Sequence, residues 1–423
     1  MKRLPAILLL LFAAAVSNAQ QSVNVLFIGN SYTEVNNLPQ MTATIAQSMG
    51  DQLTYGSNTP GGCTFAQHCV NQSMSLIRQG DWDIVVLQEQ SQLPSFPQQQ
   101  VENEVFPYAR QLVDAIYASN HCAEPMFYMT WGRKNGDQLN AAEFPPLGTY
   151  EGMDSLLCLR YTYMANSNDA SLCPVGRVWN YLRHTSNIEL YQSDESHPSL
   201  AGTYAAACAF YTMFFQRDPD SITYTPNGIN ANDAATIRNA VHNVVFEHLE
   251  QWKRRPPKAH FNIEAVVENN VVLMPMVTDA DTAIWDFGDG TTQIITNNQC
   301  QTTTTHTYAE SGTYSITLTA RRHCITSIAA DDVTITLPDP VVINSPSSSD
   351  FFSIEPNPIT DRATIHSNSK GQLTIIASNG RPVQQIKLGD TTCTLGLSHL
   401  QSGMYVLLFR SENGVMRRKI VKR

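Results

Sequence analysis

Two short segments of the chain carry the residue types that acyl transfer needs. Gly29-Asn30-Ser31 follows a short apolar run, and backbone N–H groups are free where such a strand turns into a helix, which favours a negative charge on oxygen. Asp194 and His197 stand far along the same region. A serine hydroxyl becomes a nucleophile when an imidazole accepts its proton and a carboxylate orients that imidazole. The two segments therefore predict a triad of Ser31, His197 and Asp194.

Each segment alone has a simpler interpretation. Serine is a common first residue of a helix, so Ser31 could act only as a cap. An aspartate three residues before a histidine could be a solvated pair in a surface loop. The segments lie at opposite ends of one α/β region, and a fold that brings its ends together would join them. We therefore prefer the catalytic interpretation.

Three other residues, Cys63, His68 and Cys69, have the chemistry of metal ligands. They lack a fourth ligand and the spacing of zinc sites, so we predict no metal and a packing or disulfide role for the cysteines. Trp131 and Arg133 follow a strand-like run. The sequence leaves open whether they line a substrate site or whether Trp131 belongs to the core.

Alternating strand and helix patterns must position the triad. Apolar runs predict strands at 23–28, 83–88 and 126–131, and helical spacing is found at 38–49, 73–79, 101–119 and 201–215. Strands separated by helices pair in parallel through right-handed crossovers, which gives a three-layer α/β/α sandwich. Ligands bind such sheets beyond the carboxyl ends of the strands. We therefore expect residues 29–33, 88–92 and 131–135 to converge.

Five blocks in chain order resemble the SGNH (GDSL-like) hydrolase superfamily, and most closely a branch common in exported proteins of Bacteroidetes. They are GNSYT from Gly29, GGCT from Gly61, VLQEQS from Val86, MTW from Met129 and DESHPS from Asp194. The resemblance covers residues 22–250 and implies a flavodoxin-like α/β/α fold. It also implies a serine hydrolase without a metal or organic cofactor, in which the N–H groups of Ser31 and Gly62 contribute to an oxyanion hole.

The third block departs from the superfamily pattern, which usually has Gly-x-Asn-Asp with the Asn side chain completing the oxyanion hole. In this chain Gln90 aligns with that Asn, and Gln88 stands at the strand end. A glutamine amide donates the same N–H one carbon further out. The sequence leaves open which of the two completes the oxyanion hole.

Two further regions are rich in short β patterns with turn residues. The segment WDFGDGT from Trp285, with His306-Thr307-Tyr308, resembles a PKD domain, an Ig-like β-sandwich. The segments IEPNP from Ile354, GRP from Gly380 and LQSGMYV from Leu400, with the terminal KIVK, resemble the type IX secretion sorting domain. The predicted organisation is a signal peptide at 1–19, an SGNH hydrolase domain at 20–255, a PKD domain at 258–338, a linker at 339–350 and a sorting domain at 351–423.

The charge, the cysteine content and the N-terminus restrict the possible functions further. Lys2 and Arg3, an apolar run and a small-residue site before Gln20 predict a signal peptide. A formal charge of −10 argues against a nucleic-acid partner. We expect no transmembrane segment in the mature protein. Disulfides are plausible in an exported chain, and we predict the pair Cys300–Cys324 because both fall in one small domain.

The expected function is that of a secreted or cell-surface serine esterase, which the type IX machinery exports across the outer membrane. The expected substrate is an acylated glycan, which makes the enzyme a carbohydrate O-acetylesterase. One alternative is a lipid or lysophospholipid esterase. The other is a non-catalytic surface binding module, an adhesin built on an inactive scaffold. The resemblance to a PKD domain implies either a spacer or a domain that makes weak contacts with glycans or proteins, and the sequence leaves this open.

Overall fold

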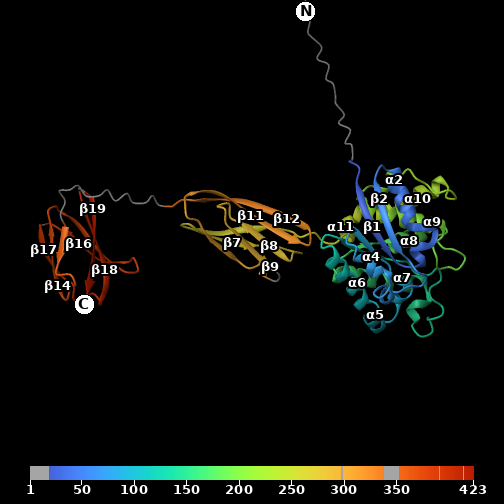
Figure 1. Ribbon diagram of the computed structural model, residues 1–423, viewed down its shortest axis with the longest axis horizontal. Helices are drawn as coiled ribbons and strands as arrows, with labels where there is room; N and C mark the ends of the chain where they lie inside the picture. Colours follow the sequence, from blue (N-terminus) through green and yellow to red (C-terminus); the bar gives the residue numbers. More distant parts are fainter. Residues whose placement is uncertain (1–18, 297–298, 338–351, 390, 413) are drawn as a thin grey trace, which may run out of the picture. The chain divides into compact units, whose positions relative to one another are not determined.

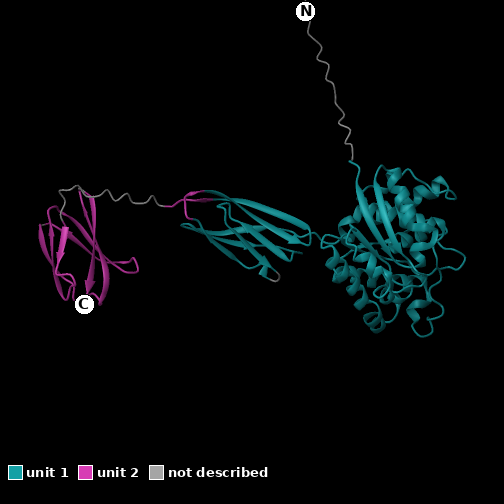
Figure 2. Cartoon of the chain, viewed as in Figure 1, with its two compact units in different colours: residues 1–308, 313–333 teal, residues 309–312, 334–423 magenta. Residues whose placement is uncertain are grey.

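The computed structural model describes residues 19–296, 299–337, 352–389, 391–412 and 414–423 (Figure 1). Most of the predicted signal peptide and all of the predicted linker therefore lie outside the described residues. The chain divides into two compact units, one of residues 1–308 and 313–333 and the other of residues 309–312 and 334–423 (Figure 2). Within the described ranges, no helix has both the length and the hydropathy that crossing a bilayer requires.

The first unit begins with a parallel sheet of order β2-β1-β3-β4-β5. Its strands are β1 (Ser22–Ile28), β2 (Gln52–Asn58), β3 (Ile84–Leu87), β4 (Glu124–Tyr128) and β5 (Ser171–Cys173). All four residues of β3 are buried, as expected of a strand with helices over both faces. The strand order reverses beside β1, and ligands bind at such a switch point. Ile28 pairs with Leu87 in register, so the loops after β1 and β3 leave the sheet at the same edge.

Helices cover both faces of this sheet (Figure 1). They are α1 (Ser31–Glu34), α2 (Leu38–Ser48), α3 (Phe65–His68), α4 (Gln72–Ile77), α5 (Gln98–Glu104), α6 (Phe106–Ser119), α7 (Tyr150–Ser167), α8 (Val175–Thr185), α9 (Leu200–Phe215), α10 (Ala231–Val244) and α11 (Leu249–Trp252). Phe210 of α9 packs edge-on against Phe27 of β1, 5.6 Å between ring centroids. On the opposite face, Phe65 of α3 packs against Phe127 of β4. The predicted α/β/α class is confirmed.

The predicted helix 101–119 is interrupted. The structure has α5 and α6 instead, separated at Val105, with a proline at the start of α6. Pro107 has no N–H to donate, and its ring would clash with the carbonyl four residues earlier in a continuous helix. Since proline is well tolerated in the first turn of a helix, a new helix begins at Phe106.

Two antiparallel sheets follow in the region of the PKD resemblance, with orders β10-β7-β6 and β12-β11-β8-β9. The strands are β6 (Phe261–Val267), β7 (Asn270–Pro275), β8 (Thr282–Asp286), β9 (Thr292–Thr296), β10 (Thr304–Thr307), β11 (Gly312–Arg322) and β12 (Ile325–Ile335). Trp285 is fully buried and packs edge-on against Phe261. Trp285 is therefore a core residue.

The second unit contains two further antiparallel sheets, with orders β13-β14-β17 and β16-β15-β18-β19. The strands are β13 (Phe352–Glu355), β14 (Arg362–Ser367), β15 (Gly371–Ala377), β16 (Pro382–Leu388), β17 (Thr392–Gly396), β18 (Gly403–Ser411) and β19 (Gly414–Lys422). Phe352 stacks on Phe409 across the two sheets at 5.0 Å. The two small all-β domains predicted after the α/β domain are thus present.

The predicted disulfide Cys300–Cys324 is wrong. Cys324 is bonded to Cys122 of the α/β region, 202 residues away in sequence, whereas Cys300 is a buried free thiol. Cys324 lies in the turn between β11 and β12, and its neighbour His323 stacks on Tyr117 of α6 with ring centroids 3.8 Å apart. This turn packs against the α/β region, so Cys324 meets a cysteine outside its own sandwich.

Candidate active site

The turn that carries Ser31, the predicted nucleophile turn, lies at the end of β1. Asn30 has an extended backbone and caps α1, because its side-chain oxygen accepts the N–H of Tyr32 at 3.1 Å. Ser31 is the first residue of this helix, so its own N–H has no acceptor within the helix. A Cβ on Gly29 would lie 2.6 Å from the side-chain oxygen of Gln88. Only glycine fits where the strand turns beneath Ser31.

The structure brings the three predicted triad residues together. His197 Nε2 lies 2.8 Å from Ser31 Oγ, and His197 Nδ1 is hydrogen bonded to Asp194 Oδ2. Asp194 Oδ1 accepts the backbone N–H groups of Ser196 at 3.1 Å and His197 at 3.0 Å. An ionised carboxylate can only accept, so Nδ1 carries the imidazole proton and Nε2 is free to accept from Ser31.

The electrostatics of the pair favour this protonation state. Partial burial raises the pKa of Asp194, but hydrogen bonds from the His197 side chain and from the backbone of His197 and Ser196 outweigh burial and lower the pKa overall. Asp194 therefore stays ionised at neutral pH. The pair is also open to solvent, with 32 % of the His197 side chain and 47 % of the Asp194 side chain exposed.

The turn that holds Gly62 lies beside the nucleophile turn. Asn30 Nδ2 donates to the carbonyl of Cys63 at 3.1 Å, which ties the two turns together. Gly62 has φ +66° and is exposed, and a Cβ there would meet no atom within 4 Å. Glycine is therefore favoured at this position by the backbone conformation, while the space around it stays open.

Gln88 and Gln90, the two candidates for the third oxyanion donor, have different surroundings. Gln88 is fully buried, its Oε1 accepts from Asn30 N and Thr33 Oγ1 at 2.9 Å each, and its amide NH₂ donates to the Glu89 carbonyl. Gln90 is partly exposed, and two backbone N–H groups of its own loop fix its oxygen. Its Nε2 makes one long hydrogen bond of 3.2 Å to Gln92. The Gln90 amide is therefore partly open to solvent, whereas the Gln88 amide is enclosed.

Sequence reasoning gave no role to Glu89, although it joins two of these loops. The carboxyl group is fully buried and accepts the N–H of Phe65 at 3.0 Å and of Gln90 at 2.6 Å. Burial raises its pKa to about 8, against the opposing effect of these backbone hydrogen bonds. The signal available in the sequence was a charged residue directly after a buried strand.

The remaining candidates have structural surroundings. Both ring nitrogens of buried His68 are engaged, Nε2 by the Gly29 carbonyl at 2.9 Å and Nδ1 by Ser73 Oγ at 2.8 Å. Trp131 is fully buried and stacks on Tyr32, so it belongs to the core. Arg133 is partly exposed and lies 3.5 Å from the buried carboxylate of Asp137.

One group of metal-ligating residue types comes together among the described residues. The ligand atoms of Asp218, Asp220 and His242 lie within 4.8 Å of one another. His242 Nδ1 is 2.8 Å from Asp218, and this hydrogen bond raises the pKa of His242. Because His242 and Asp218 are already hydrogen bonded to one another, we interpret the group as a hydrogen-bonded pair with Asp220 nearby.

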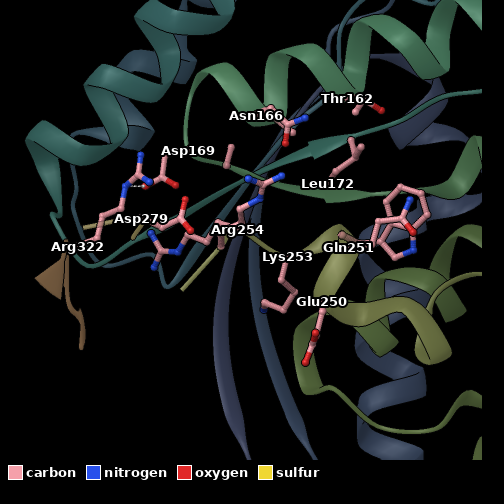
Figure 3. Close-up of a pocket in the computed structure, with 14 residues that line it drawn as sticks. Thr162, Asn166, Asp169, Leu172, Glu250, Gln251, Lys253, Arg254, Asp279 and Arg322 are labelled. Atoms are coloured by element: carbon pink, nitrogen blue, oxygen red, sulfur yellow. Dashed lines mark ion pairs between the residues drawn. The ribbon is translucent and has the colours of Figure 1, made fainter. Parts of the chain in front are cut away.

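A cavity of about 450 Å³ lies away from the triad, between α7, the residues around Arg254 and the β-sandwich. Arg322 and Asp169 point toward one another there and form an ion pair at 2.6 Å (Figure 3). No triad residue lines this cavity. The side chains that line this cavity belong to the contact between the α/β region and the sandwich.

Three solved structures are similar to the α/β part of the chain. One is a DUF4886 family protein from Bacteroides uniformis (19 % identity, 55 % of this chain and 98 % of that chain, TM-score 0.48). A second is a protein from Slackia heliotrinireducens assigned to the SGNH hydrolases (26 % identity, 45 % and 97 %, TM-score 0.37). A third is a variant of an acetyl xylan esterase from Geobacillus stearothermophilus (14 % identity, 45 % and 94 %, TM-score 0.33). No curated protein matches the chain.

Family models match the two all-β regions. Residues 264–337 match the PKD domain, and residues 353–423 match the secretion system C-terminal sorting domain. Both matches confirm the resemblances found in the sequence. The sorting domain indicates that the chain is exported to the cell surface or secreted.

Proposed function

We propose that the α/β domain is a serine esterase with Ser31 as nucleophile, His197 as general base and acid, and Asp194 as the carboxylate that orients the imidazole. The observation that carries this proposal is the continuous hydrogen-bonded chain from Ser31 Oγ through His197 to Asp194. An imidazole that is oriented by a carboxylate and lies beside a serine at a helix start is the arrangement that activates a hydroxyl.

The reaction then has two halves. Ser31 Oγ bonds to the ester carbonyl carbon while its proton passes to His197 Nε2, and the imidazolium, stabilised by Asp194, returns that proton to the leaving alcohol oxygen as its bond to carbon breaks. In the second half, water attacks the acyl-enzyme through the same proton transfers, and the acid is released. The oxyanion of each tetrahedral intermediate is held by the N–H groups of Ser31 and Gly62 and by the Gln90 amide. In this proposal Gln88 supports the nucleophile turn instead.

We propose an acylated glycan as the substrate, with acetyl as the acyl group. The triad is exposed, which suits an ester on a bulky polymer. In the loops at 29–33, 59–64, 88–92 and 192–198, no large hydrophobic side chain is exposed. A lipid esterase needs apolar surface around its nucleophile to hold an acyl chain, so the polar rim favours a glycan over a lipid. Export to the cell exterior is consistent with such a substrate.

The test is hydrolysis of p-nitrophenyl acetate by the full chain without its predicted signal peptide, with labelling by a fluorophosphonate probe. Ser31→Ala and His197→Ala should each lower kcat by at least about 10³-fold, and Ser31→Ala should abolish labelling. Ser167→Ala and His184→Ala, at exposed positions outside the triad, are the matched controls and should keep parental activity.

The outcomes separate the alternatives. If the parent chain is neither active nor labelled, the esterase proposal is wrong and a binding module takes its place. A series of p-nitrophenyl esters of increasing chain length distinguishes substrates, because a rate that rises with chain length contradicts an acetylesterase. Release of acetate from acetylated xylan, and not from its deacetylated form, would support the glycan substrate.

A further inference from the structure

The residue after Ser31, Tyr32, has a buried hydroxyl that contacts the loop carrying His197. Only 2 % of Tyr32 is exposed. Its hydroxyl lies 2.7 Å from Ser196 Oγ. Tyr32 lies in α1, directly after β1, and Ser196 lies in the loop that carries His197. The phenol therefore connects the segment that carries Ser31 to the loop that carries His197.

Ser196 is fixed at each of its polar groups. Its N–H donates to Asp194 Oδ1 at 3.1 Å, its carbonyl accepts the indole N–H of Trp131 at 3.1 Å, and its hydroxyl meets Tyr32 at 2.7 Å. Ser196 precedes His197 directly, as Tyr32 follows Ser31 directly. The Tyr32–Ser196 and Ser31–His197 hydrogen bonds therefore join the same two backbone segments.

The Tyr32 ring is held independently of its hydroxyl. It lies parallel to Trp131 with centroids 4.8 Å apart, and Trp131 stacks in turn on Trp179 at 3.7 Å. The His197 imidazole packs edge-on against Tyr32 at 5.4 Å. Phenylalanine at this position keeps all these ring contacts and removes only the hydroxyl, so the substitution isolates the hydrogen bonds.

We propose that Tyr32 is a positioning residue, whose hydroxyl fixes the loop carrying His197 at the distance from Ser31 that proton transfer requires. This inference rests on the proposed esterase function. Proton transfer needs the base within hydrogen-bond reach of the hydroxyl, and small misplacements of reacting groups cost large factors in rate. The catalytic contact alone cannot hold this geometry, because it must break and form again in every turnover.

The test compares Tyr32→Phe with the parent in the full chain. We expect kcat for p-nitrophenyl acetate to fall about 10- to 100-fold with KM within about twofold, and fluorophosphonate labelling of Ser31 to slow by the same factor. Tyr204→Phe is the matched control, because Tyr204 is fully buried and its hydroxyl donates to the Tyr224 carbonyl at 2.8 Å, outside the triad. The control should keep parental kcat and labelling.

Ser196→Ala removes the same hydrogen bond from its other end, and it decides the question if Tyr32→Phe does not fold. Its loss in kcat should equal that of Tyr32→Phe, and the double variant should lose little more than either single variant. The positioning role is wrong if the double variant loses the product of the two single-variant factors in kcat, or if Tyr32→Phe has parental kinetics. An unlabelled, inactive parent chain overturns the esterase proposal and this inference with it, so the two failures are distinguishable.

Discussion

Replacing Glu89 by glutamine should remove a large pH dependence from the stability of the α/β domain. The carboxyl group is fully buried, and among the described residues it accepts hydrogen bonds only from the backbone N–H groups of Phe65 and Gln90. Burial raises its pKa from 4.5 to about 8. The protonated acid can still accept both N–H groups through Oε1. Glutamine at this position presents the same oxygen and carries no charge at any pH.

The sign follows from proton binding. Between pH 4.5 and about 8, the folded chain retains the Glu89 proton that the unfolded chain has lost. The unfolded state then binds fewer protons, so the free energy of unfolding falls as pH rises through this window. Each pKa unit corresponds to about 1.4 kcal/mol. From pH 5 to pH 8 the parent should lose up to about 4 kcal/mol that Glu89→Gln retains.

The assay is urea unfolding at one-unit steps from pH 5 to pH 9, followed by tryptophan fluorescence. Four of the five tryptophans lie in the α/β domain, so the signal reports mainly on it. Glu143→Gln, at an exposed glutamate, is the control and should follow the parent at every pH. A constant difference between Glu89→Gln and the parent from pH 5 to pH 9 would refute the reasoning, because Glu89 would then not titrate in this window.

Three further predictions concern the disulfide and the nucleophile turn. The double substitution Cys122→Ser and Cys324→Ser should lower the free energy of unfolding by about 2–5 kcal/mol without changing kcat, measured by thermal unfolding and p-nitrophenyl acetate hydrolysis. Gly29→Ala should destabilise the chain by about 1–3 kcal/mol and lower kcat, because its Cβ would meet the Gln88 oxygen at 2.6 Å. Gln90→Ala should lower kcat about 10²- to 10³-fold. It should lower Tm less than Gln88→Ala, because the backbone partners of Gln90 are only partly buried whereas those of Gln88 are left buried and unpaired.

The central strands and most helices of the α/β domain could be predicted from the sequence, because burial on both faces leaves continuous apolar runs. The edge strands β2 and β5 could not. β2 is largely accessible and has no apolar run, and β5 has only three residues. Strand order and the partner of Cys324 depend on packing between elements far apart in the chain, which a local pattern does not record.

Within the site, local spacing decided what could be predicted. Asp194 reaches His197 within one turn of backbone, so the D-x-x-H spacing predicts their hydrogen bond. A serine directly after a strand is likewise predicted to lie at the sheet edge where His197 meets it. Gln88 and Gln90 have the same functional group two residues apart, and only the path of the loop buries one and exposes the other. The sequence indicates no role for the Tyr32 hydroxyl. Its hydroxyl gains meaning from Ser196, 164 residues away, because the fold places them on adjoining loops. The residue types of this candidate site can therefore be predicted from local spacing, whereas their geometry depends on contacts between segments far apart in the sequence.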